Sequence, residues 1–177
     1  IIKDKGGSGG NREVKSDNVF LDRLSDFDLT LEKLPLTFKG GNIFMDEFRG
    51  RQVAFIGSDI VTDTRMVLQK ALGINVPEKF VVEELKTYLR ADSAVVLGGG
   101  DRQPLNMFHL DQAMVLLGSG VAAVTKIIHD ESISVDPEVH SVNKFLDDLR
   151  EELKGLGYKV LDIDVTVEDV RNFRYYV

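Results

Sequence analysis

Residues 106–112 bring a histidine and a carboxylate within two positions of each other. His109 and Asp111 stand at the start of an apolar run, residues 113–117, which is typical of a strand. Strand side chains alternate between faces, so the pattern predicts that His109 and Asp111 share one face. An imidazole beside a carboxylate can hold a cationic group and transfer its protons. The alternative is a histidine at a strand edge that only hydrogen-bonds to a nearby carboxylate.

The tripeptide Gly40-Gly41-Asn42 is a second candidate element. Paired glycines permit a backbone with positive φ and the close approach of a ligand. The Asn42 amide offers both a hydrogen-bond donor and an acceptor. We therefore predict that this tripeptide contacts a ligand, and the alternative is a simple bulge or turn.

Two further polar residues are candidates for the same pocket. Asp59 follows the carboxyl end of an expected buried strand, and Asn106 lies in the loop directly before His109. For the segment around Asp59 the sequence favours the alternative that Thr62 or Asp63 caps a helix.

Other ligand sites are less well supported. The Gly98-Gly99-Gly100 run lacks the Lys-Ser/Thr of a phosphate-binding loop, so it predicts a loop with unusual backbone angles. A metal site would need His109 and Asp111 to meet His129 or His140. However, His129 lies far along the next strand, and His140 is expected on the solvent face of a helix. We expect neither a metal nor a cofactor.

Composition narrows the function classes. The 177-residue chain has 43% hydrophobic residues, no cysteine and a net charge of −7 with a pI near 5.0. The acidic balance argues against a broad nucleic-acid surface, and the lack of cysteine excludes disulfides and thiolate sites within the chain. No apolar run is long enough to span a membrane and no signal peptide is visible, so we expect a cytoplasmic protein without a membrane partner.

Apolar spacing and turn residues predict strands alternating with helices, an α/β or α+β class. The hairpins between helices argue against a simple all-parallel sheet. The expected strands are 36–39, 43–45, 52–57, 93–97, 110–117, 121–128 and 158–165, and the chain end, 172–177, also reads like a strand. The expected helices are one from Ser58 or Thr62 to Leu72 with Met66, Val67, Lys70 and Ala71 on one face, 78–90 with Phe80, Val81, Leu85 and Leu89 in a stripe, and 136–155.

Taken together, these residues resemble the pentein superfamily of guanidino-group-modifying enzymes, which includes agmatine, arginine and peptidylarginine deiminases. The matching segments are 38–43, 53–59 and 106–111, in this order, and the resemblance covers residues 36–117 well and the remainder loosely. It implies an α/β propeller of five ββαβ modules, of which this chain would hold about three. The chain, 1–177, would be one partial domain, with an irregular Gly-rich segment at 1–35 and modules at 36–177.

The resemblance also implies a chemistry. A cysteine thiolate would attack the carbon of a substrate guanidinium, with His109 as the general acid/base and Asp111 as the carboxylate that grips the planar cation. The substrate would be agmatine, arginine or peptidyl-arginine, which the matched motifs do not distinguish. The substrate-binding residues would be Gly40, Gly41, Asn42, Asp59 and Asn106.

The chain departs from this pattern in two ways. The nucleophilic cysteine of the family lies near the C-terminal end of its fold, and no cysteine occurs here. Both chain ends read as internal, so we expect a piece of a larger protein with the cysteine outside it. Some members also carry Asp where Asn42 stands, and others take that carboxylate from further upstream, here before Ile1.

Two alternatives to a deiminase stay open, and a homo-oligomer is possible in each case. One is a non-catalytic relative that binds or scaffolds, motivated by the missing cysteine and by Asn42. The other is an unrelated metal-dependent α/β enzyme that uses His109 as a ligand.

Overall fold

The computed structural model describes residues 36–38, 40–98, 103–104, 107, 109–128 and 137–171. All of them belong to the second of the two units into which the chain divides, Pro35–Val177. The predicted Gly-rich N-terminal segment, Asn106, His129 and the strand-like end at 172–177 lie outside the described residues.

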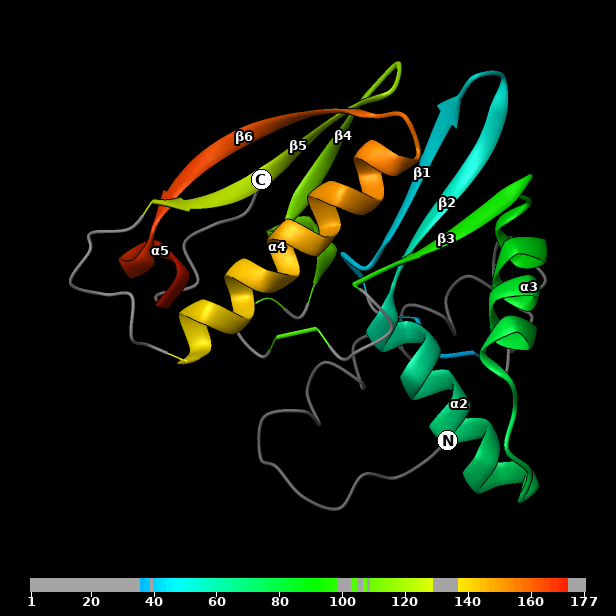
Figure 1. Cartoon of the computed structure of the whole chain (residues 1–177). Coiled ribbons are helices and arrows are strands. Elements are labelled where there is room, and N and C mark those ends of the chain that lie inside the picture. Colours follow the sequence, from blue (N-terminus) through cyan, green and yellow to red (C-terminus); the bar gives the residue numbers. More distant parts are fainter. Residues whose placement is uncertain are drawn as a thin grey trace, which may run out of the picture. The chain divides into compact units, whose positions relative to one another are not determined.

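The first half of this unit is a strand pair, two helices and a return strand. Strand β1 (Ile43–Phe48) pairs antiparallel with β2 (Arg51–Gly57), and β2 pairs parallel with β3 (Ser93–Leu97). Helices α2 (Ser58–Leu72) and α3 (Glu78–Leu89) form the crossover between β2 and β3. The result is one ββαβ unit with an additional helix (Figure 1).

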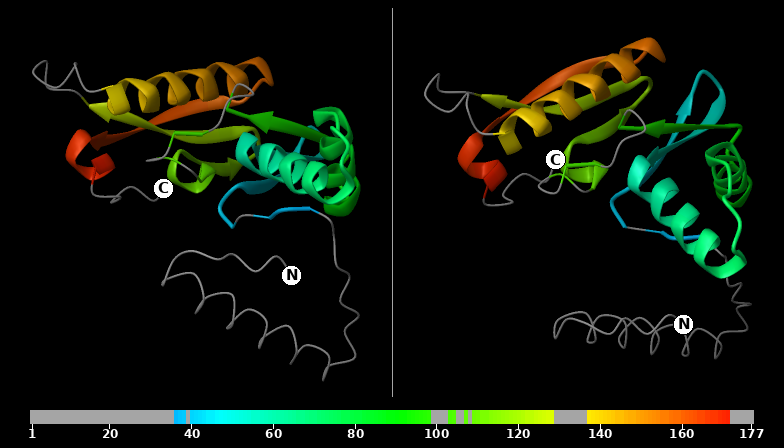
Figure 2. Two further views of the ribbon diagram at one scale, coloured as in Figure 1. Left: turned by 90° about the horizontal axis from the view of Figure 1, so that it is seen from below. Right: turned by 60° about the horizontal axis from the view of Figure 1, so that its bottom comes forward.

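The second half repeats this order after a short 3-10 helix, η3 (Leu110–Gln112). Strand β4 (Met114–Gly118) pairs antiparallel with β5 (Val121–Ile128), which pairs parallel with β6 (Lys159–Thr166). Helix α4 (Pro137–Gly155) connects β5 to β6 and lies along this sheet, and α5 (Val167–Arg171) follows (Figure 2).

The predicted mixed α/β class is confirmed, and ββαβ units are present. The described residues contain two such units, each with its own three-stranded sheet. The predicted number of about three modules and a closed propeller are not confirmed. Among the helices of the described part, none is long and apolar enough to cross a membrane.

The two hairpins form where the sequence places turn residues. Arg49 and Gly50 have φ values of 54° and 73°, and Ser119 and Gly120 have 52° and 74°. Positive φ at both central residues gives the turn whose twist matches that of antiparallel strands. Turns therefore form at 48–51 and 118–120, between strands that the sequence predicts.

Strand β2 is buried on both faces, as its continuous apolar sequence predicts. Val53 and Phe55 face a core cluster that includes α4, whereas Ala54 and Ile56 face α2 and α3. This alternation follows from the two-residue period of a strand. Because β2 lies between two cores, its end at Gly57 is held firmly in place.

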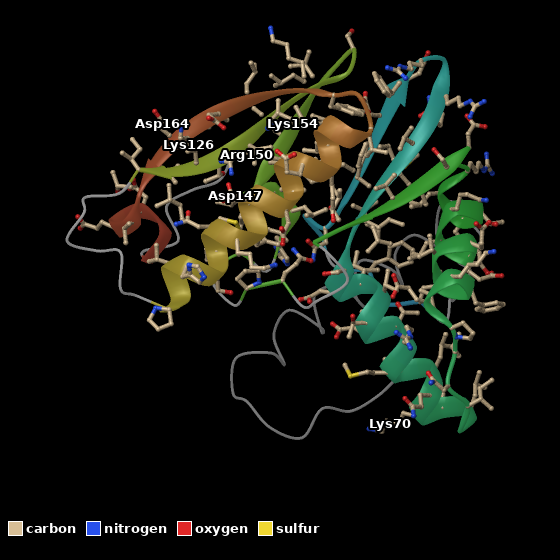
Figure 3. The ribbon with its side chains drawn as sticks, in the orientation of Figure 1. Lys70, Lys126, Asp147, Arg150, Lys154 and Asp164 are labelled. Atoms are coloured by element: carbon tan, nitrogen blue, oxygen red, sulfur yellow. The ribbon has the colours of Figure 1, made fainter. Side chains whose placement is uncertain are left out.

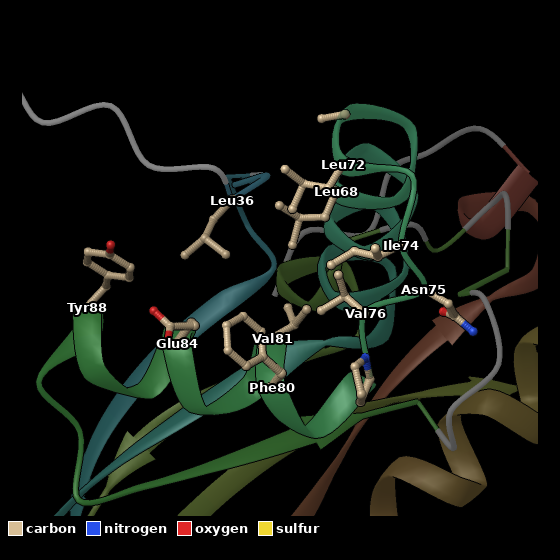
Figure 4. A pocket seen from close by; sticks show the side chains of 12 residues that line it. Leu36, Leu68, Leu72, Ile74, Asn75, Val76, Phe80, Val81, Glu84 and Tyr88 are labelled. Carbon is tan, nitrogen blue, oxygen red and sulfur yellow. The ribbon is translucent and has the colours of Figure 1, made fainter.

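Helices α2 and α3 start and end near the predicted residues, with Gly73 as the left-handed C-cap of α2. However, the predicted apolar faces are partly wrong. Met66 and Phe80 are about half exposed, and the buried face of α2 is formed by Ile60, Val61, Thr64 and Leu68. An apolar cavity of about 540 Å³ lies between the two helices, with Phe80 and Val81 in its lining (Figure 4).

The predicted strand at 36–39 is wrong for its described residues, Leu36 to Phe38, which form no strand. The backbone N–H of Thr37 donates to Oγ1 of Thr64 at 3.0 Å, so it bonds to α2 instead of a neighbouring strand. Within the described part of the chain, the first strand begins at Ile43 and continues to Phe48, beyond the predicted end at residue 45.

A tyrosine connects the two ββαβ units at the end of β1 that lies far from Asn42. The hydroxyl of Tyr158 donates to Oδ2 of Asp46 at 2.7 Å, and its ring packs on Phe48 and Phe55 with centroids 4.4 and 5.5 Å away. Burial raises the pKa of the Tyr158 phenol far above its usual value, and the hydrogen bond and negative charge of Asp46 add to this.

We predict that Tyr158→Phe lowers the free energy of unfolding at neutral pH by about 1.5–3 kcal/mol, because it removes a hydrogen bond to a charged group. The folded state favours the neutral phenol, so wild-type stability should fall as pH rises above the usual phenol pKa of 10.0. Tyr158→Phe has no phenol proton to lose, so its stability does not change in this way. The difference in free energy of unfolding between wild type and variant should therefore become smaller at alkaline pH. Urea unfolding from pH 7 to 11 tests this, with Tyr88→Phe on the exposed surface of α3 as the control.

Candidate functional site

The candidate site forms where three chain segments meet: the turn before β1, the end of β2 and the 3-10 helix before β4. Gly41 has φ +77°, and its carbonyl oxygen accepts the N–H of Asp111 at 2.9 Å. A Cβ on Gly41 would lie 2.3 Å from Oδ2 of Asp111. Only glycine satisfies both the backbone angle and this close approach.

Asn42 lies directly beneath this turn and is completely buried. Its side-chain oxygen Oδ1 accepts the backbone N–H of Leu110 at 2.7 Å and the side-chain amide of Gln103 at 3.1 Å. Its backbone oxygen accepts the N–H of Gly57 at 2.9 Å. Asn42 therefore holds the end of β2 and the segment that carries His109 and Asp111.

Asp59 lies in the first turn of α2 and is almost completely buried. Its Oδ1 accepts the backbone N–H of Gln103 at 3.2 Å. The predicted alternative, in which Thr62 or Asp63 caps the helix, is wrong because α2 already begins at Ser58 and both residues lie within it. Because Asp59 is buried, we assign it to the residues that hold the site in place.

His109 and Asp111 are close together, but not because they lie on a strand. The predicted strand start at residue 110 is wrong, since residues 110–112 form the 3-10 helix η3 and β4 begins at Met114. His109 has extended angles at the N-cap, and its Nδ1 lies 3.9 Å from Oδ1 of Asp111. The His109 and Asp111 side chains are 26% and 36% exposed, so both reach solvent.

The hydrogen bonds around η3 explain why this segment does not continue β4. The N–H of His109 donates to the side-chain oxygen of Gln112 at 3.2 Å, and the hydroxyl of Thr125 donates to the backbone oxygen of Gln112 at 3.1 Å. Arg150 on α4 in turn donates to the backbone oxygen of Thr125 at 2.6 Å. Arg150 reaches from α4 toward β5, which carries Lys126 (Figure 3).

Gln103 is the member of this network that the sequence did not single out. It is almost completely buried and bonds to both Asn42 and Asp59. The loop before His109 was expected to border a pocket, but no local pattern distinguishes this glutamine within it. Its partner Asn42 is 61 residues away in the chain, so no short motif could indicate the contact.

The described residues leave two buried side-chain oxygens without a hydrogen-bond partner, and both belong to this site. They are Oε1 of Gln103 and Oδ1 of Asp111. A buried acceptor of this kind is costly and therefore uncommon in folded proteins. A ligand with several N–H donors would satisfy a carboxylate such as Asp111.

The remaining predicted residues are placed differently. Gly40 faces open space, because an added Cβ would meet no atom within 4 Å. Asn106 lies outside the described residues. His140 is exposed on α4, as predicted. Gly98 has φ +105° and donates its N–H to Glu152 at 3.3 Å, in agreement with the unusual backbone angles predicted for that loop.

Among the described residues, two cavities lie apart from the His109–Asp111 pair, and no metal cluster includes it. In the described part of the chain, no group of three or more His, Asp or Glu side chains is arranged to hold a metal ion. The α2–α3 cavity is lined almost entirely by apolar residues. A second cavity of about 440 Å³ lies at the β1–β2 hairpin, beside Arg49 and Tyr158.

Solved structures resemble this arrangement of strands and helices. The C. jejuni agmatine deiminase matches with a TM-score of 0.59 and 20% identity, over 89% of this chain and 42% of that one. This chain has part of the fold of the solved deiminases. A C. jejuni agmatine deiminase variant with bound substrate matches with a TM-score of 0.55 and 20% identity, over 84% and 40% of the two chains.

A Porphyromonas gingivalis protein provisionally assigned as an arginine deiminase has the same deiminase fold. It matches with a TM-score of 0.57 and 17% identity, over 84% of this chain and 43% of that one. The chain thus spans less than half the length of these deiminases. No protein-family model and no curated protein sequence matches it. The pentein resemblance is confirmed at the level of the fold.

We predict that Gly41→Ala destabilises the protein by about 1–3 kcal/mol, because it strains a positive-φ backbone and forces Asp111 to move. Gly40→Ala is the matched control, since its Cβ meets open space. Chemical denaturation of both variants measures the difference. Equal stabilities would contradict the close approach of the turn to Asp111.

Proposed function

We propose that the full-length protein containing this chain is a deiminase-type hydrolase of a guanidino substrate. The observation that carries the proposal is the 3.9 Å contact between His109 and Asp111 on a deiminase fold. Both side chains reach solvent from a rigid, hydrogen-bonded support. This is the arrangement expected of groups that bind and protonate a small cation.

Asp111 is proposed to bind the guanidinium group. A guanidinium is planar and always charged, and it presents N–H donors that match the two oxygens of a carboxylate. Oδ1 of Asp111 is buried in this structure and has no hydrogen-bond partner among the described side chains and backbone, so it keeps an acceptor site that a bound donor would satisfy. The carbonyl of Gly41 fixes the backbone of Asp111 and hence the direction of this acceptor.

His109 is proposed as the general acid/base for attack by a cysteine outside these residues. The thiolate adds to the guanidinium carbon, and His109 donates a proton to the departing nitrogen, which leaves as ammonia. The remaining thiouronium then accepts water, from which His109 removes a proton. Cleavage of the carbon–sulfur bond releases the ureido product and returns the thiolate.

The predicted substrate-binding residues divide into two groups in this proposal. Gly40 faces open space, so its backbone is available to a ligand, whereas Gly41 lies against Asp111 and is assigned to positioning that carboxylate. Asn42 and Asp59 are buried, so we assign them to holding the site in place. Asn106 remains a predicted substrate contact.

A non-catalytic guanidino-binding protein is the second candidate, because the 177 residues contain no cysteine. It would retain the Asp111 carboxylate and the same cation preference. The two candidates differ in one measurable property: the enzyme releases ammonia from its ligand, whereas the binding protein returns the ligand unchanged.

We predict that His109→Gln in the full-length protein lowers ammonia release from agmatine, arginine or a peptidyl-arginine substrate by about 100- to 10,000-fold, the usual contribution of a general acid/base. The control is His140→Gln, which changes an exposed histidine on α4. Coupled ammonia detection gives the rates. Turnover at the wild-type level in His109→Gln would contradict the assignment.

A further inference from the structure

Gln103 is held at both ends within the support of the candidate site. Its backbone N–H donates to Oδ1 of Asp59 at 3.2 Å, and its side-chain Nε2 donates to Oδ1 of Asn42 at 3.1 Å. The side chain is only 5% exposed, so it does not exchange these contacts for water. Gln103 therefore joins the start of α2 to the turn before β1.

The backbone N–H of Leu110 determines how the side-chain amides of Asn42 and Gln103 are oriented. The N–H of Leu110 can only donate, so the Asn42 atom 2.7 Å away must be its oxygen. The same oxygen then requires a donor from Gln103, which turns Nε2 toward Asn42. Oε1 of Gln103 is consequently left on the side of Gly57, where an added Cβ would lie 2.5 Å from it.

This orientation leaves Oε1 buried without a partner in the described structure. An unpaired buried acceptor lowers stability, and an apolar side chain of the same length would avoid that cost. Packing alone therefore does not explain an amide at this position. What the amide supplies is a donor that fixes the side chain of Asn42.

We propose that Gln103 is a positioning residue for the His109–Asp111 pair and acts through Asn42. Leu110, whose N–H is held by Asn42, lies between His109 and Asp111 in the chain. When the Gln103 donor is present, Oδ1 of Asn42 stays directed at that N–H, and the two flanking side chains keep their separation. This inference rests on the proposed deiminase function, which it extends by one residue.

The first experiment replaces Gln103 by Met in the full-length protein, because Met has similar length and no N–H donor. We expect kcat for the guanidino substrate to fall by about 10- to 100-fold, the usual effect of a small misplacement of catalytic groups. KM should change less than kcat, and the thermal midpoint should not fall. Unchanged kcat, or a loss of folding, would overturn the proposal.

Two further variants separate positioning from packing. Gln69→Met is the matched control, since it makes the same exchange at an exposed position of α2. Gln103→Glu keeps the shape but can donate to Asn42 only when its carboxyl group is protonated. Its kcat relative to wild type should therefore recover as pH is lowered, whereas equal relative kcat at all pH values would contradict the role of the donor.

A spectroscopic measurement distinguishes failure of this inference from failure of the proposed function. The imidazole Cε1–H resonance of His109, identified by its loss in His109→Gln, should shift in Gln103→Met while that of His140 stays in place. A wild-type protein that releases no ammonia would refute the deiminase proposal alone. A His109 resonance that does not move would refute the positioning role.

Discussion

One side-chain oxygen, Oδ1 of Asn42, carries the connection on which the candidate site depends. It is completely buried, and it accepts hydrogen bonds from Leu110 and Gln103. An amide oxygen has two lone pairs, so both are occupied. The neighbouring Gly41 brings the backbone close enough to bind the N–H of Asp111. The turn and the 3-10 helix are thus joined by the bonds from Leu110 to Asn42 and from Asp111 to Gly41.

Strand β1, which follows Asn42, is held further along its length by a different interaction. β1 starts immediately after Asn42 and carries Asp46, which accepts the hydroxyl of Tyr158 from the second ββαβ unit. Between these two points, Phe55 of β2 packs in the core cluster that contains α4. Two polar contacts with an apolar core between them hold the first ββαβ unit against the second. His109 and Asp111 therefore rest on regular elements of both units.

The described residues supply only some of the groups that a deiminase reaction needs. In the proposed function, Asp111 supplies an acceptor for a cation and His109 a proton carrier, on a fold shared in part with a solved agmatine deiminase. The described residues provide no thiol, because the chain has no cysteine and spans less than half of the solved deiminases it resembles. In the proposed function, the described residues form the part of the site that binds and protonates the guanidino group.

Local sequence determined the elements whose signals lie within a few residues. The hairpin turns, the helices ending at Gly73 and Gly155, and the buried strand β2 all follow from turn residues and apolar spacing. The pairing of His109 with Asp111 was also readable, because only one residue separates them. Burial of Asn42 and Asp59 was not, since short polar side chains give no sign of the backbone donors they will meet.

Tertiary structure alone decided the geometry of the site. The predicted strand began at Leu110, but hydrogen bonds from Leu110 to Asn42 and from Thr125 to Gln112 hold these first residues in η3. Gln103 belongs to the site because its side chain donates to Asn42, which lies 61 positions away in the chain. Such bonds depend on where β1, α2 and η3 come to lie after folding. The sequence by itself identified the candidate side chains. Which of them are in contact was decided by the packing of the strands and helices that carry them.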